Sequence, residues 1–239
     1  MGATHLTPEH PNLRQTAGRL RRTMWVWAAL AAGMGVLTAS PAIGGSLVQA
    51  LGWFAAAALM ALFVQPVLLA LAAVQWALSL VSWIPGVPHI LGGDPMTALL
   101  NPGAFESFGL ALVRVLLAIT AWNQFLFYRM LYGTGRSAGL DSSLPPIPEV
   151  VTNRTDTWAL AARALGVLGL AAALLALPLT SPARLLAIQA GLVLASLGIG
   201  LGMGTAFSPT GRRGAALFGV GAAVAAFVLA LAAGATQPR

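Results

Sequence analysis

Apolar runs dominate this sequence and decide what the chain can fold into. A helix of about 20 apolar residues is long enough to cross the hydrocarbon core of a lipid bilayer. Runs of about this length or longer occupy residues 24–40, 42–83, 105–132, 158–179, 183–207 and 214–234. Only 8% of the residues are charged, whereas a soluble domain carries about 25%. The sequence therefore predicts an integral membrane protein.

The number of membrane spans depends on the long apolar run over residues 42–83. As a single helix this run would be about 60 Å long at 1.5 Å per residue, about twice the thickness of the hydrocarbon core. Gln65 and Pro66 interrupt it. Either one span ends near Ala70 and an amphipathic segment follows in the membrane interface, or Gln65 and Pro66 turn a tight helical hairpin. The first arrangement gives six spans and the second gives seven.

The predicted fold class is all-α: a polytopic transmembrane helical bundle with six spans, and with seven as the alternative. A two-residue turn between two short crossings is the harder geometry, which favours six. The distribution of arginine favours seven, because most arginines then lie on one side of the membrane, as the positive-inside rule requires.

One domain accounts for the whole chain. Residues 1–23 form a polar, basic N-terminal tail, residues 24–235 the single transmembrane helical domain, and residues 236–239 a short C-terminal tail. Four arginines precede the first apolar run, namely Arg14, Arg19, Arg21 and Arg22. By the positive-inside rule the N-terminus is expected in the cytoplasm, and we expect the chain in a bacterial inner (plasma) membrane.

Polar residues inside the run 105–132 are the first candidates for a site. Arg114 lies well inside this run, where a charge costs roughly 3 kcal/mol on insertion scales. It either snorkels to the membrane surface, pairs with a buried structural partner, or binds an anionic ligand. Asn123 and Gln124 are candidate contacts for a ligand or partner. Glutamines elsewhere in the spans are typical interhelical hydrogen-bonding residues: Gln49, Gln65, Gln75 and Gln189.

Closely spaced glycines in the run 183–207 are candidate helix-packing residues. Gly198 and Gly202 are four residues apart, and so are Gly200 and Gly204. This spacing puts small residues on one face and lets the backbones of two helices approach closely. The pattern predicts a tight bundle within the chain, or an assembly surface between chains.

Several chemistries are excluded by missing residue types. The chain has no cysteine and no lysine, which excludes disulfides, thiolate metal sites and a retinal Schiff base. The three histidines lie in a tail or a loop, so haem ligands and a Ser–His pair inside a span are missing as well. Acidic residues, which proton- and cation-coupled transporters place within their spans, are not found in the middle of any run. We therefore expect no enzyme activity, no cofactor and no metal.

The remaining function classes are non-catalytic. The leading hypothesis is an integral membrane subunit that anchors or scaffolds a larger membrane protein complex, with polar loops at residues 84–104 and 133–157 adding surface contacts. The alternative is a small membrane transporter, or a substrate-binding component of one, in which Arg114 meets an anionic or polar solute. Expected partners are membrane lipids and other membrane protein subunits, in hetero-oligomeric rather than homo-oligomeric association. A net charge of +7 among so few charges indicates anionic headgroups rather than nucleic acid.

Overall fold

Helices account for almost all of the chain that the computed structural model describes, which is residues 11–40, 46–80, 102–137, 155–180, 182–207 and 213–235. Within these residues the helices are α1 (Pro11–Ala39), α2 (Leu47–Leu62), α3 (Val67–Ser79), α6 (Pro102–Ser137), α7 (Thr155–Leu175), α8 (Ala183–Ala206) and α9 (Arg213–Ala235). The prediction of an all-helical chain is confirmed for this part of the protein.

Four of the helices are long and apolar enough to cross a membrane. They are α6, α7, α8 and α9, with candidate spans at Gly109–Arg129, Thr157–Leu175, Ala183–Ala206 and Arg213–Ala233. The structure thus supports a helical membrane protein. Six or seven crossings remain a prediction, because α2 and α3 are shorter apolar helices of 16 and 13 residues.

Helices α1 and α6 extend beyond the boundaries predicted from the sequence. The tail predicted over residues 1–23 is helical from Pro11 onward, where it continues into α1 without a break. Helix α6 extends the predicted run 105–132 at both ends, to Pro102 and Ser137. It therefore includes parts of both predicted loops, and the loop residues 81–101 and 138–154 lie outside the described residues.

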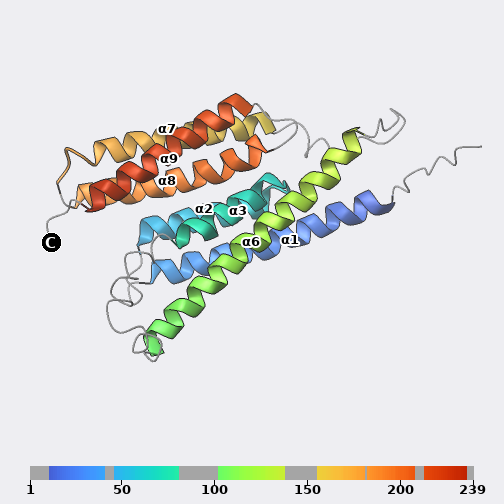
Figure 1. Ribbon diagram of the computed structural model, residues 1–239, viewed down its shortest axis with the longest axis horizontal. Helices are drawn as coiled ribbons and strands as arrows, with labels where there is room; N and C mark the ends of the chain where they lie inside the picture. Colours follow the sequence, from blue (N-terminus) through green and yellow to red (C-terminus); the bar gives the residue numbers. More distant parts are fainter. Residues whose placement is uncertain are drawn as a thin grey trace, which may run out of the picture.

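The helices are arranged as a closed bundle and a more open group (Figure 1). Helices α7, α8 and α9 all pack against one another. In the other group α1 packs on α2, and α3 lies between α6 and α8, so that α3 joins the two groups. Successive helices run in opposite directions, and α1 begins at the end of the molecule opposite to the end where α9 finishes (Figure 1).

Helices α2 and α3 form a hairpin, which is one of the two arrangements considered for residues 42–83. The chain turns through residues 63–66: Phe63 is extended, with φ −119° and ψ 123°, and Pro66 immediately precedes α3. Proline suits the start of a helix because the missing N–H has no intrahelical acceptor there. The turn is therefore longer than two residues, which removes the geometric objection to a hairpin.

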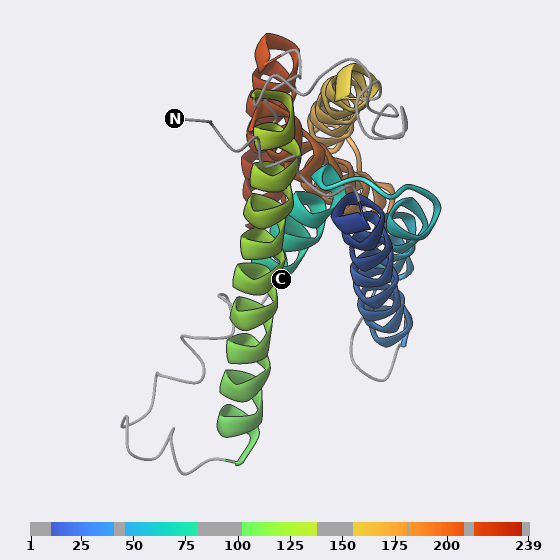
Figure 2. The ribbon, with the colours of Figure 1, turned by 90° about the vertical axis from the view of Figure 1, so that its right-hand side faces the viewer.

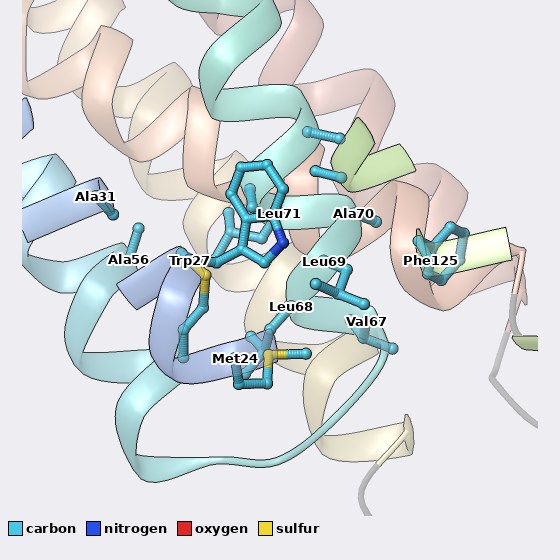
Figure 3. Close-up of a cluster of buried hydrophobic side chains, with 14 of the residues drawn as sticks. Met24, Trp27, Ala31, Ala56, Val67, Leu68, Leu69, Ala70, Leu71 and Phe125 are labelled. Carbon is cyan, nitrogen blue, oxygen red and sulfur yellow. The ribbon is translucent and has the colours of Figure 1, made fainter. Parts of the chain in front are cut away.

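The core of the molecule surrounds α3. Every residue from 67 to 73 is buried, so α3 is not an amphipathic segment at a surface. Met24 and Trp27 of α1 and Phe125 of α6 belong to the same cluster as Leu68 and Leu69 of α3 (Figure 3). A half-length helix is thus held in the centre by the apolar side chains of its neighbours.

Candidate functional site

Polar side chains between the helices give the clearest candidates for function, and most of them are paired within the chain. Trp158 of α7 donates its indole N–H to the Oε1 of Gln65, at 2.6 Å, and both side chains are buried. Gln75 of α3 donates to the hydroxyl of Ser196 in α8, at 3.1 Å. These glutamines attach the α2–α3 hairpin to the closed bundle, Gln65 just before α3 and Gln75 in the second half of α3.

Two further contacts attach other helices through side-chain amides. The hydroxyl of Ser46, directly before α2, donates to the Oε1 of Gln189 in α8 at 2.8 Å. The indole N–H of Trp27 in α1 donates to the Oε1 of Gln124 in α6 at 2.7 Å. Gln124 is thus a contact between helices of the same chain, one of the roles expected of glutamine in a span.

Among the described residues, Arg114 is held by the end of α3 and not by a carboxylate. Its Nη1 donates to the backbone oxygen of Ser79, at 3.1 Å. Ser79 is the last residue of α3, and the carbonyls in the last turn of a helix lack intrahelical donors and carry partial negative charge. The arginine therefore satisfies a helix C-terminus and fixes α6 against α3.

Arg184 repeats this arrangement in the closed bundle. It lies near the start of α8 and donates from Nη2 to the backbone oxygen of Ala233, in the last turn of α9, at 2.9 Å. Two arginines in apolar helices thus serve helix C-termini. A backbone acceptor of this kind carries no sequence signature, so the partner of Arg114 could not be found from the sequence.

The four candidate glycines of α8 are all buried against other helices of the same chain. A side-chain carbon on Gly198 would meet Gly166 of α7 and Ala223 of α9, and one on Gly202 would meet Val220 of α9. On the adjacent face, Gly200 lies against Leu71 and Gly204 against Val67, both of α3. The glycines thus let α8 approach three helices of its own chain, and an assembly surface between chains has to be sought elsewhere.

Asn123 is the candidate residue that the structure leaves without an internal role. It lies exposed on α6, beside the half-buried Gln124. Within the described part of the chain its amide has no hydrogen-bond partner. Thr120, on the same side of α6, is also exposed, but its hydroxyl donates to the backbone oxygen of Leu116 at 2.7 Å. Among the described residues, the Asn123 amide makes no such hydrogen bond to the backbone of its own helix.

Depth makes the exposure of Asn123 informative. The candidate span of α6 is Gly109–Arg129, whose middle residue is Ile119. Asn123 lies four residues further on, which is about 6 Å along the helix axis. In a helix that spans the bilayer, a residue this close to the middle is shielded from water, and an unpaired amide there costs roughly 2 kcal/mol or more. The position therefore calls for a hydrogen-bonding group that the described chain does not supply.

Tryptophan and tyrosine side chains make contacts between helices that the sequence did not predict. Trp158 and Trp27 each donate to a glutamine, and the hydroxyl of Tyr128 lies 3.4 Å from that of Thr23. A buried indole N–H normally finds an acceptor. These Trp–Gln pairs could have been suspected from the sequence, because tryptophans occur near the ends of the predicted spans and glutamines occur within them.

Helix α6 is also attached to α8 by aromatic contacts. The ring of Phe207 is 5.8 Å from that of Trp122 in an edge-to-face arrangement. The guanidinium of Arg129 lies 5.9 Å from the centre of the same Phe207 ring.

No protein family, curated protein or solved structure matches this chain.

Proposed function

We propose that this protein is a non-catalytic integral membrane subunit that anchors or scaffolds a larger membrane protein complex, and that it assembles through α6. The observation that carries this proposal is the exposed Asn123 within the apolar span of α6. Lipid tails offer no hydrogen bond, whereas a transmembrane helix of another subunit does. An amide at this depth is therefore best explained by a protein neighbour.

The position of α6 supports the same role. Helix α6 stands at the edge of the molecule (Figure 2). In the apolar part of α6 only 11% of the residues are buried inside the protein, compared with 50% in the apolar part of α8. A helix held on one side by α3, α1 and the end of α8, with its opposite face open, is suited to joining a neighbouring subunit.

The transporter alternative is not favoured by a specific observation. It depended on Arg114 meeting a solute and on glutamines lining a path. Arg114 donates to a backbone oxygen of α3, and four of the glutamines bond to side chains of other segments of the same chain. These side chains are engaged in holding helices together.

The test of assembly is the mass and composition of the native protein extracted from membranes in mild detergent. We expect a complex larger than the 24.5 kDa chain that contains further polypeptides. Ile119→Trp, which places a bulky group on the exposed face of α6, should release the partners that bind through α6. Val224→Trp, at a similarly exposed apolar position on α9, is the matched control and should retain them. A free single chain in the mildest detergent would contradict the proposal.

We further propose seven passes across a bacterial inner membrane, with the start of α1 on the cytoplasmic side and the α2–α3 hairpin as two short passes. The alternating helix directions (Figure 1) support an odd number. Arginines gather at the end of the molecule where α1 and α9 begin, with Arg184 at the other end. The first group consists of Arg19, Arg21, Arg22, Arg129 and Arg213. This asymmetry agrees with the positive-inside rule.

Thiol labelling from one side of the membrane tests the number of passes, because the chain has no native cysteine. Gly18→Cys and Gly214→Cys introduce thiols at exposed positions near the starts of α1 and α9, and Thr180→Cys introduces one after α7. With seven passes, the first two label from the cytoplasmic side and the third from the opposite side. With six passes, Gly18→Cys and Thr180→Cys would label from the same side.

A further inference from the structure

The exposed surface of α6 contains a seven-residue repeat centred opposite its buried face. At about 100° per residue, Leu112 lies about 180° around the helix from Ala121, which is fully buried in the core. Two sets of positions recur every seven residues along this line: Gly109, Leu116 and Asn123, and then Leu112, Ile119 and Leu126. Alternating spacings of three and four residues are those of the contact line between two paired helices. We call these six residues the α6 seam.

The seam is open and has room for another helix. Leu112, Leu116 and Ile119 are each at least half exposed. A side-chain carbon on Gly109 would meet no other atom within 4 Å. Leu126 is half-buried and marks the edge of the seam nearest the molecule. The seam thus offers large apolar side chains, one glycine that permits close approach, and a single polar residue, Asn123.

Asn123 indicates what covers the seam. A carboxamide has both a donor and an acceptor, so two such groups facing each other satisfy one another. Two copies of this chain inserted in the same membrane have parallel α6 helices. Across a two-fold axis along the membrane normal, each seam residue then faces its own equivalent. Asparagine in one set of a seven-residue repeat is the residue that fixes the register of parallel helix pairs.

From these observations we infer that the α6 seam binds the α6 seam of a second copy, with the two Asn123 amides hydrogen-bonded across the axis. A second copy supplies the matching group at the required depth by symmetry, whereas any other helix would need a polar residue at that same depth. The inference rests on the proposed function, since it names the neighbour of α6 in the complex. Other subunits would then join a pair of this chain.

Disulfide formation in native membranes tests the pairing, with the full-length chain carrying one introduced cysteine at a time. Leu112→Cys and Ile119→Cys are in the seam, while Val113→Cys is the matched control. Val113 is as exposed as Leu112, at 50%, but lies about 100° further around the helix. After mild oxidation, Leu112→Cys and Ile119→Cys should form a reducible dimer, confirmed by co-capture of two differently tagged copies. Val113→Cys should form roughly tenfold less, because a disulfide tolerates only a narrow range of Cβ separations.

Asn123 is tested in the same assay, with Leu112→Cys as the reporter. Asn123→Leu should lower the yield of the dimer roughly three- to tenfold, the range expected for an interhelical hydrogen bond in a membrane. Asn123→Gln keeps the amide and should retain most of the yield. Equal yields from Leu112→Cys and Val113→Cys, or an undiminished yield with Asn123→Leu, would overturn the inference.

The inference and the proposed function can fail separately. If thiols in the seam link only to a different polypeptide, the second copy is excluded while the role as a subunit stands. If the dimer forms and the extracted complex contains this chain alone, the pairing stands and the larger complex is excluded. If no link forms and the extracted protein is a single chain, both fail.

Discussion

Different contacts hold the closed bundle of α7, α8 and α9 together and attach α6 to its neighbours α3 and α1. In the bundle, glycines bring backbones together: a side-chain carbon on Gly219 of α9 would lie 2.8 Å from backbone atoms of Ala162 and Arg163 in α7. Helix α6 is held instead by side chains that reach across, as Arg114 does to Ser79 and Trp27 to Gln124. The first kind of contact tolerates no added atom, whereas the second combines the packing of large side chains such as Phe125 with individual hydrogen bonds.

The two kinds of contact should differ in how strongly they resist separation of the helices. Backbone contacts between small residues involve many atoms along the length of each helix, so they resist displacement. A hydrogen bond between side chains in a membrane contributes only about 1 kcal/mol. We therefore expect the closed bundle to unfold as a unit, and α6 to detach from α3 first.

The largest effect is expected from adding one methyl group to the closed bundle. Gly219→Ala places a carbon 2.8 Å from the backbone of α7. Because a backbone cannot rotate away as a side chain can, the cost should be about 3 kcal/mol, the upper end of the usual range for overpacking. Gly221→Ala is the matched control two residues away on α9, where an added carbon meets no atom within 4 Å. It should be neutral or stabilising by up to about 1 kcal/mol. The free energy of unfolding in an SDS titration measures both, and equal values would refute the distinction between the two regions.

Removing the charge that holds α6 should have the second largest effect. Arg114→Leu leaves the carbonyl of Ser79 without this donor. Hydrogen bonds to charged groups contribute about 1.5–3 kcal/mol, and the loss should be about 1.5 kcal/mol because Arg114 is only half-buried. Arg114→Lys should restore part of the loss, because lysine keeps the charge without the planar guanidinium. The readout is the SDS concentration at which α6 becomes accessible to protease. Full stability and full assembly with Arg114→Leu would contradict the role assigned to this residue.

The smallest effect is expected at the contact between α1 and α6. Trp27→Phe and Gln124→Leu each remove one side of the 2.7 Å hydrogen bond. In a double-mutant cycle the coupling energy between the two substitutions should be about 0.6 kcal/mol, typical of hydrogen bonds between membrane helices. The SDS titration used for the glycine variants provides the four free energies of unfolding. Additive effects would mean that the two side chains act independently.

Most of the helices could be predicted from the sequence because apolar length is a strong signal in a membrane protein. The runs 158–179, 183–207 and 214–234 agree with α7, α8 and α9 to within a few residues. The start of α1 at Pro11 was missed because Arg14, Arg19, Arg21 and Arg22 are polar yet good helix formers. Hydropathy reports the apolar part of a helix and not its full length.

The candidate site was less predictable, since it depends on which way each side chain faces. Asn123 and Gln124 are adjacent in the sequence, yet Gln124 bonds to α1 while Asn123 points away from the bundle. Both residues fit the same pattern, and only the rotation of α6 about its axis separates them. The four glycines of α8 posed the same difficulty, because spacing alone does not say whether the facing helix belongs to the same chain.

The hairpin of α2 and α3 has a consequence for the order in which the chain matures during synthesis. Three of its polar contacts are with residues made much later: Gln65 pairs with Trp158, Gln75 with Ser196 and Ser46 with Gln189. At about 24 Å and 20 Å, α2 and α3 are also too short to span the bilayer core without help. A growing chain that has reached only the end of α6 therefore has α1 and α6 beside the hairpin but lacks the surface that α7 and α8 supply. We therefore expect the central helix to reach its final position only after α8 has left the ribosome, so that the earliest third of the chain depends on the last third.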